Sequence, residues 1–236
     1  MRILLAGPDH ARGSLPPYLN VLASELRRAG AHVDRLGSTT TAYDTGRGRF
    51  HDRDWVTAAA DDLATLADPT RYDVVSLHFG NLEIEQLLPE RWRRHAITLP
   101  PVAVHVHALS PTLFTRHIPA PDLRAAVDAG ISAAAGLVYF GHYARTALTG
   151  GLPATAGIPA LVAPLPTTIP AGIIPTASPA LDDAHPDSIL LSLYGYAAPW
   201  KSAPDLLAAL DATAAPVRVV LAGPFWDDPD QAGVDL

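Results

Sequence analysis

Short apolar segments alternate with stretches of helical spacing along the N-terminal part of the chain, and this alternation constrains the fold most strongly. Apolar runs bounded by turn residues are typical of strands buried in a parallel sheet. We expect strands at residues 2–6, 31–36, 72–77, 102–106 and 137–140. The intervening helices are expected at residues 15–29, 54–67, 82–92, 122–129 and 142–148. Regular alternation of this kind predicts an α/β fold with a doubly wound parallel sheet.

The composition changes after Leu165, where prolines become frequent and charges few. Such a stretch is typical of an extended linker. Beyond it, an apolar run, a helical segment and a second apolar run predict one further, truncated βαβ unit. We therefore expect a first domain at residues 1–165, a linker at 166–187 and an incomplete βαβ fragment at 188–236.

Charge and composition exclude several classes of protein. The net charge of −7 and the pI of about 5.7 give no electrostatic basis for binding nucleic acid. The chain has no cysteine, so neither a disulfide nor a thiolate zinc site is available. No apolar run reaches the roughly 18 residues that a transmembrane helix requires. We expect a cytoplasmic protein without a transmembrane segment.

Several segments resemble the motifs of a known enzyme family when they are taken in chain order. They are MRILLAGPDHARGSLPPYLNVLASELRRAGAHVDRL, YDVVSLHFGN, PPVAVHVHALSP, GLVYFGHYARTAL and SILLSLYGYAAPWKSAPDLLAAL. Their order and approximate spacing resemble those of the motifs of the retaining GT-B glycosyltransferases. The resemblance is to glycosyltransferase family 4, the group 1-like enzymes. The resemblance implies a Rossmann-like, acceptor-side N-terminal domain followed by the start of a donor-side domain.

The resemblance also implies a reaction and a set of site residues. Enzymes of this group transfer a sugar from a nucleotide-diphosphate sugar to an acceptor hydroxyl, usually without a metal or another cofactor. Gly13 and Ser14 match the loop near the donor phosphates and the acceptor, and the alternative is a plain turn between strand and helix that requires glycine. His107 matches the histidine beside the reacting sugar, which makes it the expected catalytic residue. Lys201 matches the lysine that neutralises the leaving diphosphate.

One further site residue follows from the expected sheet. Ligands of open α/β folds bind at the carboxyl edge of the sheet, and His78 lies near the end of its predicted strand. We therefore add His78 to the substrate-binding residues. Glu83 and Glu85, which follow it, are either bases for an acceptor hydroxyl or ordinary carboxylates at a helix N-terminus.

The sequence also departs from the family pattern, which leaves other functions open. Gly195 and Tyr196 stand where the family has a glycine–arginine pair, so one expected diphosphate cation is missing. A catalytically inactive glycosyltransferase-like binding or partner protein is therefore the second hypothesis. A third is a metal-dependent hydrolase, because His105 and His107 form a His-x-His pair on one face of a strand. We expect no metal, and exposed strand edges favour a homodimer.

Overall fold

The structure is a computed structural model of the chain, and it describes most of the N-terminal part and three segments of the C-terminal part. The described residues are 1–10, 14–39, 52–79, 84–107, 120–164, 189–194, 203–214 and 216–222. The chain divides into two units, Met1–Pro166 and Thr167–Leu236. The linker expected at 166–187 lies outside the described residues.

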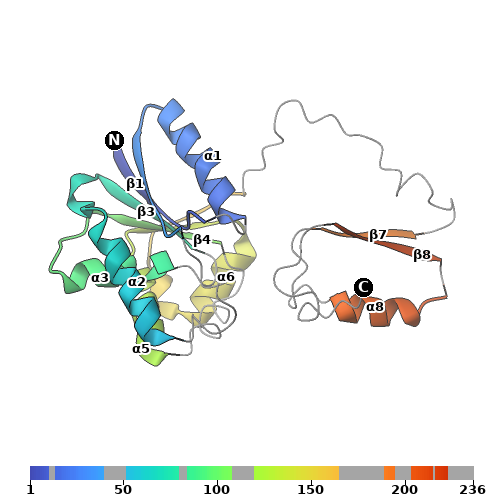
Figure 1. Ribbon diagram of the computed structural model, residues 1–236. Helices are drawn as coiled ribbons and strands as arrows, with labels where there is room; N and C mark the ends of the chain where they lie inside the picture. Colours follow the sequence, from blue (N-terminus) through green and yellow to red (C-terminus); the bar gives the residue numbers. More distant parts are fainter. Residues whose placement is uncertain are drawn as a thin grey trace. The chain divides into compact units, whose positions relative to one another are not determined.

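A parallel sheet of six described strands forms the centre of the first unit (Figure 1). Its spatial order is β2-β1-β3-β4-β5-β6, and every neighbouring pair is parallel. The strands are β1 (Arg2–Ala6), β2 (His32–Leu36), β3 (Val74–Phe79), β4 (Val102–Val106), β5 (Gly136–Tyr139) and β6 (Ala160–Val162). The order reverses between β1 and β3, which confirms the predicted doubly wound sheet and places its switch point there.

Helices connect these strands. The α-helices are α1 (Leu15–Arg28), α2 (Arg53–Thr65), α3 (Leu88–Arg94), α5 (Pro121–Ser132) and α6 (His142–Gly151). The described residues also form short 3-10 helices, η3 (Pro69–Arg71), η4 (Ile84–Leu87) and η5 (Pro153–Thr155). The Asp52 side chain accepts a hydrogen bond from the Trp55 N–H, and this cap begins α2.

The sheet separates two apolar clusters. Ile3 and Leu5 of β1 pack with Leu19 and Ala23 of α1 on one face. The neighbouring residue Leu4 belongs to the larger cluster on the other face, to which α2, α3, α5 and α6 contribute. Because side chains alternate along a strand, β1 supplies both cores, as expected for a buried parallel strand.

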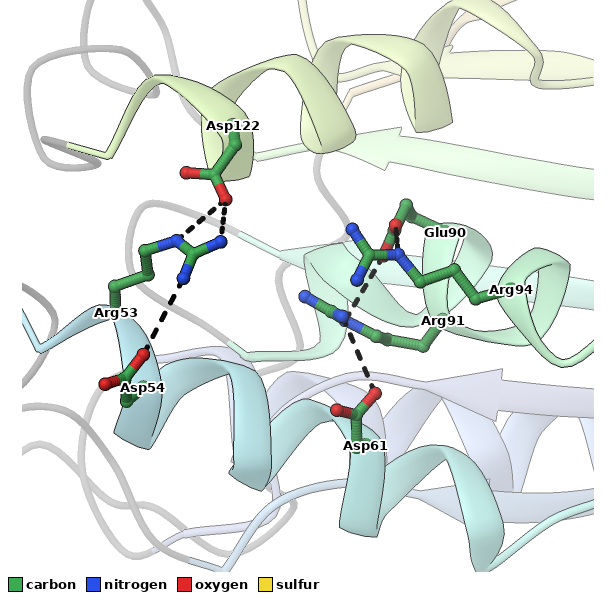
Figure 2. Close-up of polar contacts among 7 residues, drawn as sticks. All are labelled: Arg53, Asp54, Asp61, Glu90, Arg91, Arg94 and Asp122. Carbon is green, nitrogen blue, oxygen red and sulfur yellow. Dashed lines mark hydrogen bonds and ion pairs between the residues drawn. The ribbon is translucent and has the colours of Figure 1, made fainter.

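Ion pairs link the helices of the larger cluster (Figure 2). Arg53 of α2 pairs with Asp122 of α5 at 2.7 Å. The buried Arg91 of α3 lies 3.6 Å from Asp61 of α2 and 3.2 Å from Glu90. Asp61 therefore has a cationic partner on the neighbouring helix.

Two predicted elements differ from the observed ones for identifiable reasons. The single helix expected at 82–92 is a 3-10 turn followed by α3, because Pro89 lacks an N–H and fits only the first turn of an α-helix. The third strand begins at Val74 rather than at residue 72, because Asp68 caps the 3-10 turn η3 immediately before it. The strand also ends at Phe79 rather than at residue 77, so His78 lies inside β3.

The second unit contains a βαβ arrangement in its described residues. Strands β7 (Ile189–Tyr194) and β8 (Val217–Ala222) are parallel, with Ile189 opposite Val217. Helix α8 (Ala203–Asp211) lies between them in the chain. These elements confirm the predicted order of strand, helix and strand. Throughout the described part of the chain, no helix is long and apolar enough to cross a membrane.

Candidate functional site

A group of histidines lies near the carboxyl ends of β3 and β4, next to the switch point of the sheet. His78 of β3 is directly opposite His105 of β4 in the parallel register. His107 follows β4, two residues beyond His105, so the two share one face of the strand. Ser76 precedes His78 by two residues and therefore shares its face. The sheet register thus brings together residues that are about thirty positions apart in the sequence.

Hydrogen bonds connect these side chains into one chain of groups. Ser76 Oγ lies 2.9 Å from His78 Nε2 and 3.0 Å from His105 Nε2. His78 Nδ1 lies 3.0 Å from His107 Nε2. His107 is thereby linked through His78 to Ser76, and its orientation depends on both.

Two aromatic rings flank the histidines. Tyr18 of α1 contacts His107 edge-on, with ring centroids 5.2 Å apart, and lies 6.0 Å from His78. The ring centroid of Phe140, which follows β5, lies 4.6 Å from that of His107. The contacts with Tyr18 place the site on the face of the sheet that α1 covers. Apolar walls of this kind with a few polar atoms are typical of sites for small molecules.

Burial keeps the histidines uncharged at neutral pH. Desolvation, with a smaller repulsion from His105, lowers the pKa of His107 to about 3. Desolvation also lowers the pKa of His105 to about 4, and it holds the pKa of the fully buried His78 well below its usual value. The site therefore presents neutral imidazoles, which form hydrogen bonds but supply no positive charge for an anion.

Glycines allow the backbone to pack closely at the same edge of the sheet. A Cβ atom on Gly37, just after β2, would lie 2.2 Å from the carbonyl oxygen of Gly7. A Cβ atom on Gly7 would meet Leu19 at 2.7 Å and the carbonyl oxygen of His78 at 2.9 Å. The segments after β1 and β2 need glycine for this approach.

The structure describes part of the residue set that the sequence predicts. His78 and His107 are within hydrogen-bond distance of each other. Ser14 is the exposed N-cap residue of α1, and its side chain makes no capping hydrogen bond to the helix. Gly13 and Lys201 lie outside the described residues, so their roles remain predictions.

Sequence reasoning did not select Tyr18, Ser76 or Phe140. Ser76 carried a usable signal, because a polar residue two positions before His78 shares its face of the strand. Nothing in the sequence indicated Tyr18, because the apolar pattern of its helix does not show how that helix lies against the sheet.

Glu85, which the sequence offered as a base or as a helix N-terminal carboxylate, is 1% exposed and accepts a hydrogen bond from the Ser38 N–H. This carboxylate therefore connects η4 to the chain after β2.

The metal hypothesis concerned His105 and His107. Within the described residues, no group of three histidine, aspartate or glutamate side chains is arranged to hold a metal ion. The Nε2 atoms of both histidines instead face Ser76 and His78. Glu83, the other carboxylate considered as a base, is outside the described residues.

Comparison with known proteins gives a similarity of fold. No protein-family model matches the chain. No curated protein sequence matches it either. Among solved structures, a UDP-forming α,α-trehalose-phosphate synthase from Burkholderia xenovorans, in complex with glucose-6-phosphate, has a TM-score of 0.53 and 9% identity. That match covers 99% of this chain and 68% of the synthase.

A second similar structure is a ugt transferase from Siraitia grosvenorii in complex with UDP. Its TM-score is 0.48, its identity 11%, and the match covers 99% of this chain and 65% of the transferase. The similarity to the synthase shows that the chain has the GT-B type of fold that the sequence motifs suggest. At this identity the similarity concerns the fold alone.

Proposed function

We propose that this chain is part of a nucleotide-sugar-dependent glycosyltransferase that transfers a sugar to an acceptor hydroxyl. The observation that carries the proposal is the position of His107. It lies beside the switch point of a GT-B type sheet, and the family motif expects a histidine beside the reacting sugar at this position. The chain spans about two thirds of the length of the similar synthase, so the activity belongs to the whole protein.

The chemistry assigned to the site suits a sugar. In the transfer, the acceptor oxygen bonds to the anomeric carbon, the bond from that carbon to the diphosphate oxygen breaks, and the nucleoside diphosphate and a proton are released. His107 is neutral and polar, so its second ring nitrogen is suited to a hydrogen bond with a sugar hydroxyl. His78 is buried and uses both of its ring nitrogens within the site, so its part in substrate binding is to hold His107. Gly13 and Ser14 would face the phosphates and the acceptor, and Lys201 would neutralise the leaving diphosphate. The nucleotide-diphosphate sugar is a co-substrate, and no other cofactor is required.

Binding and transfer assays test this proposal. Calorimetry with UDP-, GDP- and dTDP-glucose is expected to detect binding of one donor. With a donor and a panel of acceptor sugars, His107→Ala is expected to lower transfer by at least about 100-fold, as for other groups that contact the reacting centre. His142→Ala, on the exposed first turn of α6, is the matched control. Equal transfer by His107→Ala and the wild type would exclude the role of His107.

The replacement of the family's arginine by Tyr196 favours a second function, that of an inactive binding protein of the same fold. Donor or sugar binding without any transfer, in a preparation of the complete protein, would support this function over catalysis. A homodimer, which sedimentation measures directly, is expected in either case.

A further inference from the structure

The four polar groups of the site form a single line of hydrogen bonds, and the direction of that line has a chemical consequence. Along it, His105 contacts Ser76, Ser76 contacts His78, and His78 contacts His107. Heavy-atom positions do not show which nitrogen of each ring carries the proton. Burial keeps all three imidazoles neutral, so each ring has one N–H. Only two arrangements of these protons are then compatible with the hydrogen bonds.

The hydroxyl of Ser76 has a single hydrogen, so it donates to one of the two imidazoles and accepts from the other. If His105 Nε2–H donates to Ser76, the hydroxyl donates to His78 Nε2. His78 then carries its proton on Nδ1 and donates to His107 Nε2, which leaves the proton of His107 on Nδ1. In the opposite direction, every one of these bonds is reversed and His107 Nδ1 is bare.

The environment of His105 Nδ1 decides between the two directions. This nitrogen is buried, and among the described residues it has no hydrogen-bond partner. In the first direction it is a bare acceptor, whereas in the second it is an N–H donor without an acceptor. Orphaned buried N–H groups are rarer than unsatisfied acceptors, so the first direction is favoured.

We propose that Ser76 is a positioning residue that fixes His107 as the Nδ1–H tautomer, so that His107 donates a hydrogen bond to a neutral substrate oxygen. His107 bonds to His78 through Nε2, and within the described residues its Nδ1 has no hydrogen-bond partner. Its Nε2 lone pair is occupied by His78, so His107 does not act as a general base. A sugar hydroxyl fits this donor better than a phosphate, because the neutral ring adds no charge. The identity of the substrate rests on the proposed glycosyltransferase function, but the tautomer does not.

Nitrogen-15 NMR of the imidazoles in the full chain tests the tautomer directly at neutral pH. We expect protonated Nδ1 and unprotonated Nε2 for His107, with the same pattern for His78 and the reverse for His105. In Ser76→Ala the line is broken, and we expect His78 and His107 to become mixtures of both tautomers. Ser76→Thr retains a hydroxyl and is expected to restore the wild-type pattern.

A wild-type His107 protonated on Nε2 would overturn the proposal, and this spectrum is independent of whether any variant folds. Unchanged tautomers in a folded Ser76→Ala protein would also overturn it, since a purely structural serine would leave the ring protons in place. Added sugars are expected to shift the His107 Nδ1–H signal. If the complete protein transfers no sugar while the chain still shows the Nδ1–H signal, the proposed function is refuted and the assignment of Ser76 stays intact.

Discussion

The imidazole rings of His78 and His105 stack across the neighbouring strands β3 and β4, with centroids 3.8 Å apart and planes inclined by 20°. Two positively charged rings at this distance would repel each other in a poorly hydrated site. The stack is therefore an arrangement of neutral imidazoles. Because it joins the two strands at the proposed site, protonation of either ring opposes the folded state.

The first prediction is that the stability of the protein falls as the pH drops below about 6.5. The folded pKa values of His105 and His107 are about 4 and about 3, below their unfolded value of 6.5. Between these pKa values and pH 6.5, the two histidines bind more protons in the unfolded chain than in the folded one. Above pH 6.5 they are largely uncharged in both states. Within that range, each such histidine lowers the free energy of unfolding by up to about 1.4 kcal/mol for each unit by which the pH falls.

Urea denaturation between pH 5.0 and 8.0 measures this effect before most carboxylates titrate. We expect a flat free energy of unfolding above pH 7 and a decline below 6.5. His105→Asn removes one buried imidazole, so its decline is expected to be shallower by up to about 1.4 kcal/mol per pH unit. The same steepness in wild type and His105→Asn would contradict the origin assigned to the decline.

The second prediction concerns the close backbone approach after β1 and β2. Gly37→Ala places a Cβ atom 2.2 Å from the carbonyl oxygen of Gly7, where only backbone movement can relieve the clash. We expect a loss of about 1–3 kcal/mol in the free energy of unfolding, typical of overpacking. The Cβ atom of Gly150→Ala in helix α6 meets nothing within 4 Å among the described residues, and the substitution is expected to add about 0.5–1 kcal/mol to the free energy of unfolding. Similar effects of the two substitutions would argue against the close approach.

The third prediction concerns the buried arginine between α2 and α3 (Figure 2). Arg91 is 2% exposed, and its removal in Arg91→Leu leaves Asp61 and Glu90 without that cation. We expect a destabilisation of about 3 kcal/mol, at the low end for buried pairs because Asp61 is half-exposed. Arg94, which also pairs with Glu90, is 59% exposed, so Arg94→Gln is expected to cost less than about 1 kcal/mol. Thermal unfolding of both variants provides the comparison.

The fourth prediction concerns the contact between α3 and the end of α2. The indole N–H of the buried Trp92 donates a hydrogen bond of 3.0 Å to the carbonyl oxygen of Ala64. Trp92→Phe retains an aromatic ring but removes the donor, and it is expected to cost about 1–3 kcal/mol because the buried carbonyl loses its partner. Urea denaturation followed by circular dichroism measures the loss. A change below about 0.5 kcal/mol would show that the carbonyl finds another partner.

Most of the fold was accessible from local sequence patterns. The apolar run at 2–6 and the helical spacing after Ser14 were sufficient for β1 and α1, since these signals are confined to neighbouring residues. The sequence patterns did not predict β6, because a strand of three residues, Ala160–Val162, is too short for a periodic signal. The pairing of β6 with β5 depends on a strand 23 residues earlier in the chain, since Leu137 is opposite Ala160.

The sequence alone determined the alternation of strands and helices, and it selected His78 and His107 as residues of the sheet edge. Only the tertiary structure showed that Ser76 joins these histidines in one line of hydrogen bonds and that Tyr18 covers them. The register of β3 against β4 and the position of α1 on the sheet bring these groups together. Both depend on packing between distant segments, which no local pattern encodes.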